Sequence, residues 1–234
     1  MTLSVAAVIV AAGRGLRAGG DVPKQYRSIA TGPAVRASLR LFAEHGEVDL
    51  VQPVIHSDDT ARFAQATSGL ELLPAVPGGA TRQASVRAGL EALAGHRPDV
   101  VLVHDAARPF ASAALVTRAI AATASTGAAI PVLPVSDTVK LLDPAGQMVE
   151  ATLDRSRLRV VQTPQAFAFS VLIEAHRRAL AARRDDFTDD AALAEWAGLK
   201  VAVFDGEPGN LKLTTPEDLE VVEALIREHE TVSR

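Results

Sequence analysis

The sequence contains no cysteine. It therefore excludes disulfide bonds, thiolate metal sites and a cysteine nucleophile, so any metal must be bound through oxygen atoms or histidines. Long apolar runs are also missing, because the longest extends only from Val5 to Ala12, far short of the roughly 20 residues that span a bilayer. The first charged residue, Arg14, follows this run, whereas a signal peptide begins with basic residues. We expect a soluble, cytoplasmic protein whose first apolar run is a buried strand.

The sequence also lacks an excess of positive charge. The formal net charge is -4 and the isoelectric point is near 5.9, so there is no global basic field for a nucleic-acid backbone. Any cationic site must come from a few placed residues. With 234 residues and a hydrophobic content of 48%, the chain can bury a sizeable core, and we expect residues 1–234 to form a single domain.

Short β-branched runs alternate with longer segments of helical periodicity, which is typical of parallel βαβ units. In one helical segment Val86, Leu90 and Leu93 fall on a single face that can pack on a sheet. The pattern predicts an α/β fold with a doubly wound, mostly parallel sheet flanked by helices. The predicted strands are Ser4–Val10, Val48–Ile55, Glu71–Val76, Asp99–His104 and Ala128–Leu133, and the predicted helices are Pro33–His45, Asp58–Thr67, Arg82–Ala94 and Ser112–Ser125.

The alternation stops after Leu133. Residues 136–158 have strand-like alternation around the turn DPAG, but no crossover helix follows, so they predict a protruding β-hairpin arm. Apolar residues on such an arm would be exposed unless another subunit covered them, and we therefore expect a homodimer. Beyond the arm we expect a strand at Arg159–Gln162, helices beginning at Ser170 and Thr188, a strand at Lys200–Phe204 and a last helix from Pro216.

Residues 11–27, AAGRGLRAGGDVPKQYR, form a glycine-rich segment directly after the first predicted strand. Its GRGLRA spacing fits a dinucleotide-binding fingerprint, but that fold requires a helix that begins inside the motif. Here the first predicted helix begins only at Pro33, and no Gly-Lys-Ser/Thr follows the glycines as a Walker loop requires. The segment is therefore predicted to be a long loop.

Among the basic residues of this loop, Arg14, Arg17 and Lys24 are the candidates for a phosphate site. A loop rich in backbone groups can wrap a triphosphate and a base, while cations neutralise the charge that grows during displacement at phosphorus. The alternative is a flexible surface loop whose basic residues are simply solvated.

Polar residues follow another predicted strand in the segment VLVHDAARP. Open sheets bind ligands at this carboxyl edge, where Asp105 could hold Mg²⁺ or a ribose hydroxyl and Arg108 could clamp a phosphate. An Asp–Arg pair that only closes a loop is the alternative. His104 is interpreted as a structural hydrogen-bonding residue rather than a base.

The run AAGRGLRAGGDVPKQY resembles the nucleotide-binding signature of the cytidylyltransferases that act on 2-C-methyl-D-erythritol 4-phosphate in non-mevalonate isoprenoid synthesis. Other segments resemble motifs of this family in the expected order: PGGATRQASV, VHDAARP, QTPQ, FTDD and GNLKLTTPED. The resemblance extends from Ala11 to Asp218. It implies a Rossmann-like fold, transfer of CMP from CTP to the methylerythritol phosphate with release of pyrophosphate, and dimerisation through the hairpin arm.

The resemblance also implies roles for individual residues. Arg17 and Lys24 would stabilise charge on the α-phosphate and the leaving group, and Arg155 and Lys212 would hold the attacking phosphate. The nucleotide would contact Ala11, Ala12, Gly13, Gly15, Gly79 and Ser85, and the second substrate would contact Asp105, Arg108, Thr138, Thr163 and Thr188. Mg²⁺ would bridge the triphosphate oxygens, with Asp105 as its candidate protein ligand.

Simpler interpretations of these residues stay open. Taken alone, Lys212 fits a surface lysine, Thr188 fits a helix N-cap, the GG turn fits an ordinary turn, and Thr138 and Arg155 fit a solvated hairpin. Two other functions also remain: a related nucleotidyltransferase for ribitol phosphate or a sugar phosphate, and a non-catalytic nucleotide-binding module. In some bacteria the resembled enzyme is fused to the cyclodiphosphate synthase of the same pathway, so the chain is either a stand-alone enzyme or the first part of a fusion.

Overall fold

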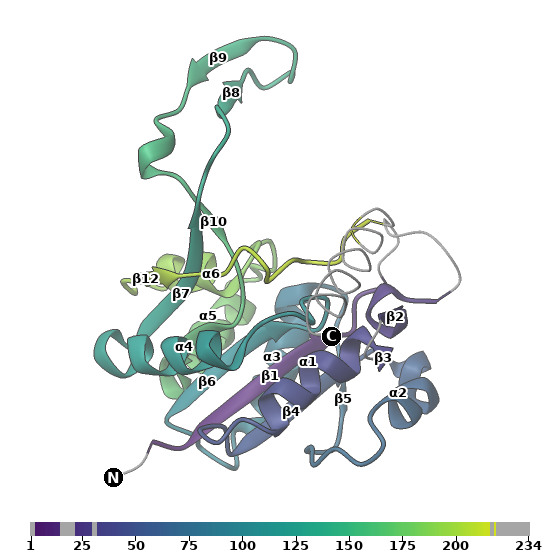
Figure 1. Cartoon of the computed structure of the whole chain (residues 1–234). Coiled ribbons are helices and arrows are strands. Elements are labelled where there is room, and N and C mark those ends of the chain that lie inside the picture. Colours follow the sequence, from purple (N-terminus) through teal and green to yellow (C-terminus); the bar gives the residue numbers. More distant parts are fainter. Residues whose placement is uncertain (1–2, 15–21, 30–31, 216–217, 219–234) are drawn as a thin grey trace.

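A computed structural model describes residues 3–14, 22–29, 32–215 and 218. Its centre is an eight-stranded sheet with the order β10-β7-β11-β6-β1-β4-β5, in which β12 pairs with β7 (Figure 1). The strands of this sheet are β1 (Val5–Ala11), β4 (Leu50–Ile55), β5 (Val76–Pro77), β6 (Val100–Asp105), β7 (Ala128–Pro134), β10 (Arg159–Val161), β11 (Gln165–Ala168) and β12 (Ala202–Asp205). Because β1 is parallel to both β4 and β6, β4 is parallel to β5, and β12 is parallel to β7, the predicted mostly parallel sheet is confirmed.

Helices cover both faces of the sheet. Helices α1 (Ala34–Ala43), α2 (Thr60–Ala66) and α4 (Ala113–Thr126) pack on one face, and α3 (Arg82–Leu93), α5 (Phe169–Ala181) and α6 (Asp190–Trp196) pack on the other. Successive residues of β1 alternate between these two cores, with Val5 in the first and Ala6 in the second. A strand that is buried on both sides must be apolar throughout, which explains the continuous apolar run at the start of the chain. No helix of the described residues is long and apolar enough to cross a bilayer.

Several predicted boundaries differ from the structure by two or more residues. The strand expected at Glu71–Val76 shrinks to Val76–Pro77, because Pro74 has no N–H for a ladder and only Leu73 donates to the neighbouring strand, to the Val51 carbonyl at 2.9 Å. The last predicted strand and the helix predicted from Thr188 begin about two residues late, and Asp189, not Thr188, caps α6 by accepting from the Ala192 N–H at 2.8 Å. The helix predicted from Pro216 lies outside the described residues.

One strand of the central sheet was not predicted at all. β11 enters the sheet antiparallel between β6 and β7, directly after the QTP segment. Its four residues have no clear apolar alternation, and its Gln165 is buried. Only its long-range partners identify it as a strand.

The predicted hairpin arm is confirmed. β8 (Lys140–Leu142) pairs antiparallel with β9 (Val149–Thr152), and the hairpin stands out from the sheet beyond β7 and β10 (Figure 1). At its tip the Asp143 carboxylate accepts from the N–H groups of Gln147 and Met148 at 2.8 and 3.2 Å. Met148 and Val149 are 69% and 59% exposed in the single chain, so the arm presents apolar surface to its surroundings.

Candidate functional site

The pocket at the carboxyl ends of β1, β4 and β6 has a volume of about 680 Å³. Open α/β sheets bind ligands at this edge. Eight of the residues predicted for the site line the pocket: Ala11, Ala12, Gly13, Lys24, Gly79, Ser85, Asp105 and Lys212. Two others, Gly15 and Arg17, lie outside the described residues. Segments that are far apart in the sequence thus meet in one hollow.

A buried glutamine shapes the wall of the pocket near the glycine loop. The Gln25 carboxamide donates to the carbonyl oxygens of Ala11 and Gly13, at 2.7 and 2.9 Å. Gln25 lies in a short 3-10 turn, Lys24–Tyr26, so the same turn that ties down the loop places Lys24 in the pocket. The sequence motif PKQY marked this segment, but the role of Gln25 as a clamp was not predicted.

The GG turn forms the opposite wall. A Cβ atom on Gly78 would lie 2.3 Å from the Ala12 Cβ and 2.7 Å from the Ser85 Oγ, so only glycine fits between the two walls. The Ser85 hydroxyl donates to the Thr81 carbonyl oxygen at 2.9 Å and accepts from the Gly79 N–H at 3.1 Å. Gly79 and Ser85, which the sequence predicted as nucleotide contacts, are therefore linked directly and fix the turn before α3.

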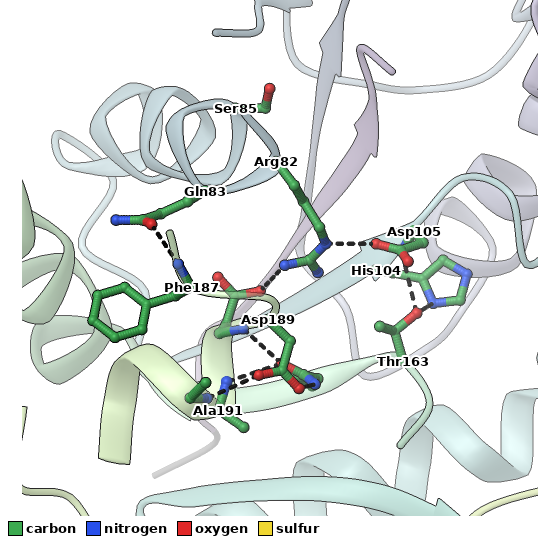
Figure 2. Close-up of polar contacts among 12 residues, drawn as sticks. Arg82, Gln83, Ser85, His104, Asp105, Thr163, Phe187, Asp189 and Ala191 are labelled. Carbon is green, nitrogen blue, oxygen red and sulfur yellow. Dashed lines mark hydrogen bonds and ion pairs between the residues drawn. The ribbon is translucent and has the colours of Figure 1, made fainter. Parts of the chain in front are cut away.

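Asp105 ends β6 inside the pocket, where two cations pair with it. Its Oδ1 accepts from Arg82 Nε at 3.0 Å and its Oδ2 accepts from Lys212 Nζ at 2.6 Å (Figure 2 shows the arginine pair). Burial alone would raise the pKa of Asp105, but Arg82 and Lys212 overcome this effect and hold the pKa far below its ordinary value. Asp105 is therefore a carboxylate at neutral pH, with both oxygens engaged.

This pairing does not favour Asp105 as a metal ligand, because a cation would have to displace Arg82 or Lys212. The described residues also contain no group of three or more histidine, aspartate or glutamate side chains that could hold a metal ion.

Comparison with known proteins gives the family. The family model for 2-C-methyl-D-erythritol 4-phosphate cytidylyltransferase matches residues 5–228. The chain belongs to this family. The prediction made from the sequence motifs is thereby confirmed.

Relatives and solved structures agree with this assignment. The chain is 62% identical over 213 residues to a bifunctional IspD/IspF enzyme of Rhodopseudomonas palustris, covering 91% of this chain but 53% of that protein. It thus spans about half the length of the curated relatives that it matches. The solved 4-diphosphocytidyl-2C-methyl-D-erythritol synthase of Anaerococcus prevotii is 32% identical with a TM-score of 0.84, and the alignment covers 97% of both chains. The cytidylyltransferase of Thermus thermophilus is 35% identical with a TM-score of 0.76, covering 97% of this chain and all of that one.

Thr163 and His104 of the cytidylyltransferase motifs are buried beside the pocket but do not line it. The Thr163 hydroxyl oxygen accepts from the Asp105 N–H at 3.2 Å and lies 3.1 Å from His104 Nδ1, while His104 Nε2 lies 3.1 Å from the Arg108 carbonyl oxygen. We assign the neutral ring a proton on Nε2, donated to that carbonyl, with Nδ1 accepting from the threonine. Burial is the main cause that lowers the pKa of His104 to about 4. His104 is thus a structural hydrogen-bonding residue, as expected.

Arg108 lies behind the pocket wall. Its Nη1 donates to the Asn210 carbonyl oxygen at 2.7 Å and its Nη2 to the Val161 carbonyl oxygen at 3.4 Å. Burial lowers the pKa of Arg108. Through its bond to Asn210 the guanidinium stabilises the segment that carries Lys212. The same segment is also held by Leu213, whose N–H donates to the Ala107 carbonyl at 2.8 Å.

The other predicted residues lie away from the pocket of the single chain. Thr138 and Arg155 are exposed at the base of the arm, where Arg155 donates to the Ser136 carbonyl oxygen. Thr188 is exposed in the loop that precedes α6. One chain therefore brings eight of the predicted residues together in the pocket, whereas Thr138, Arg155 and Thr188 do not line it.

Proposed function

We propose that this chain transfers CMP from CTP to 2-C-methyl-D-erythritol 4-phosphate and releases pyrophosphate. The observation that carries the proposal is the meeting of Lys24 and Lys212 in one pocket whose walls are the glycine loop and the GG turn. Two lysines from opposite ends of the chain suit a site that must hold two phosphorylated substrates. The proposal also rests on membership of the family.

The reaction needs no nucleophile from the protein. An oxygen of the methylerythritol phosphate attacks the α-phosphorus of CTP in line, the bond from that phosphorus to the bridging oxygen breaks, and pyrophosphate leaves with the electron pair. Catalysis then consists of positioning and charge stabilisation. We assign Arg17 and Lys24 to the α-phosphate and the leaving group, and Lys212 with Arg155 to the attacking phosphate.

We infer that Mg²⁺ enters with CTP and is bound by phosphate oxygens and water rather than by a protein cage. Magnesium commonly keeps several waters and few protein ligands in phosphate sites, and both oxygens of Asp105 are already engaged by cations. Activity should disappear with EDTA and return with Mg²⁺. The nucleotide-free protein should show no tight Mg²⁺ binding by calorimetry, and tight binding would contradict the inference.

We further propose that the chain acts as a homodimer in the cytoplasm. The exposed apolar residues of the arm support the dimer, because Leu141, Met148 and Val149 would be covered by a second copy. A partner's arm would also be the route by which Thr138 and Arg155 reach a pocket. Sedimentation should give a dimer, and Met148→Asp should shift it toward monomers; a wild-type monomer at micromolar concentration would contradict the proposal.

Pyrophosphate release tests the activity. The assay combines CTP and Mg²⁺ with 2-C-methyl-D-erythritol 4-phosphate. In the controls, ribitol phosphate replaces the methylerythritol phosphate, or ATP, GTP or UTP replaces CTP. We expect pyrophosphate release only with CTP and 2-C-methyl-D-erythritol 4-phosphate. Preference for ribitol phosphate would favour the related nucleotidyltransferase, and CTP binding without any release would favour a binding module. Lys24→Ala should lower kcat by about 10² to 10³.

A further inference from the structure

Five charged or ionisable side chains form a continuous line from the pocket into the interior. Lys212 pairs with Asp105, Asp105 with Arg82, Arg82 Nη1 with Asp190 Oδ2 at 2.7 Å, and Asp190 Oδ1 with His176 Nε2 at 3.1 Å. Figure 2 shows Arg82 reaching from the start of α3 to Asp105. The first two residues of this line, Lys212 and Asp105, carry predicted substrate roles, and the last three were not predicted as functional.

Arg82 is the member that joins the two carboxylates. Its Nε binds Asp105 and its Nη1 binds Asp190, so one rigid guanidinium plane sets the distance and angle between them. Its Nη2 is buried and has no hydrogen-bond partner within the part of the chain that the structure describes. Burial alone would lower the pKa of Arg82, but Asp190 and Asp105 raise it, so the charge is permanent. A lysine at this position could not make both contacts in this geometry.

Asp190 gives Arg82 a fixed anchor. Its side chain is 1% exposed, and that of His176, which contacts its other oxygen, is fully buried. The backbone of Asp190 is held as well, because its N–H and that of Ala191 donate to Gln165 Oε1 at 3.1 and 3.2 Å. Asp190 cannot follow a moving arginine, so the arginine is fixed by it.

The consequence reaches Lys212. With Asp105 Oδ1 held by Arg82, its Oδ2 faces the Lys212 ammonium, whose side chain is 39% exposed at the pocket. One N–H of the ammonium binds Asp105, which leaves two for an incoming phosphate. We propose that Arg82, anchored by Asp190 and His176, is a positioning residue that orients Asp105 and thereby aims Lys212 at the attacking phosphate. This inference rests on the proposed role of Lys212.

Steady-state kinetics of three variants test the inference. Arg82→Gln, Arg82→Lys and Asp190→Asn should each raise KM for the methylerythritol phosphate about five- to tenfold, and change KM for CTP less than about twofold. The matched control is Arg177→Gln, which removes a bidentate ion pair between Arg177 of α5 and Glu91 of α3 on the outer surface. It should leave both KM values unchanged. Full recovery of wild-type KM by Arg82→Lys would overturn the bridging role.

A double-mutant cycle separates positioning from a general loss of structure. If Arg82 acts through Asp105 on Lys212, then Arg82→Lys should change KM for the methylerythritol phosphate less than about twofold in a Lys212→Gln background. If the change in KM of the double variant equals the product of the changes in the two single variants, Arg82 acts by another route and the inference is overturned. Thermal unfolding of each variant identifies any that fail to fold, and the milder Asp190→Asn then replaces Arg82→Lys in the cycle.

A spectroscopic readout keeps this test independent of the proposed activity. Reductive methylation with ¹³C-formaldehyde labels the lysines, and the Lys212 signal is assigned by its loss in Lys212→Arg. This signal should shift in Arg82→Gln and not in Arg177→Gln, even without substrates. An inactive wild type would contradict the proposed function alone, whereas an unchanged Lys212 signal would contradict the positioning role alone.

Discussion

Acidification should destabilise this protein through one buried histidine. His104 is fully buried, packs on Phe42 with ring centroids 4.9 Å apart, and has a pKa of about 4 against an ordinary value of 6.5, chiefly because burial disfavours its charged form. Between pH 6.5 and pH 4, His104 is mostly protonated in the unfolded chain and mostly neutral in the folded protein. Stability is therefore complete above the unfolded pKa and falls as the pH drops toward the folded pKa.

The size of the effect follows from the two pKa values. The gap between 6.5 and about 4 corresponds to about 3 kcal/mol of unfolding free energy lost by pH 4, and to about 2 kcal/mol lost by pH 5. The pKa values of Asp105 and Asp190 are lowered in the folded state, so their contributions are lost only near and below their ordinary value of 3.8. Between pH 7 and pH 5 the histidine effect is thus separable from theirs.

Urea unfolding at pH 7.5, 6.0 and 5.0 measures this effect, with His104→Gln as the test variant and the exposed His96→Gln as the matched control. Glutamine can keep a donor toward the Arg108 carbonyl but does not titrate. We expect the wild type and His96→Gln to lose about 2 kcal/mol between pH 7.5 and 5.0 more than His104→Gln does. Equal pH slopes for His104→Gln and the wild type would show that the buried ring is not the cause.

Two further substitutions test the walls of the pocket. Gln25→Ala removes both hydrogen bonds to the glycine-loop carbonyls and should lower the free energy of unfolding in urea by about 2 kcal/mol. Because the loop is then no longer held, KM for CTP should rise about tenfold. Unchanged CTP binding would show that Gln25 does not control the loop. Gly78→Ala places a Cβ 2.3 Å from that of Ala12 and should cost about 1 to 3 kcal/mol with weaker CTP binding, whereas Gly95→Ala, where the space is open, should change neither.

Much of the fold was predictable because its strands and helices depend on local patterns. The apolar runs at β1 and β6 identify buried parallel strands, and the spacing of Val86, Leu90 and Leu93 identifies the buried face of α3. β11 could not be predicted in the same way, since its pairing with β6 and β7 depends on residues far away in the sequence. The two-residue β5 was overestimated because Leu70, Leu72 and Ala75 pack against the core but precede the strand, and Leu73 makes only a single bond to β4.

In the candidate site, too, residues marked by local motifs were predictable and long-range contacts were not. Residues next to a turn or a strand end, such as Gly79 and Asp105, were selected by their motifs, and the structure shows that they line the pocket. The pairing of Arg82 with Asp190 joins residues 108 positions apart, and no local spacing indicates it. A weaker signal was present in the arginine of the GGxxRxxSV segment, a charged residue at the start of a helix beside the predicted site.

An aspartate in a pocket that we propose to bind phosphates needs a physical reason, and Arg82 provides it. A carboxylate about 4 Å from a phosphate charge would repel it by about 4 kcal/mol at an effective dielectric constant of 20. Arg82 pairs with Asp190 as well as with Asp105, so Lys212, Arg82 and the two carboxylates carry no net charge together, and the most exposed charged group among them is the Lys212 ammonium at the pocket. In return, Asp105 holds a lysine whose free side chain would lose about 2 kcal/mol of rotamer entropy on binding. The ion pairs thus order the ammonium before the substrate arrives without reversing the charge that attracts it.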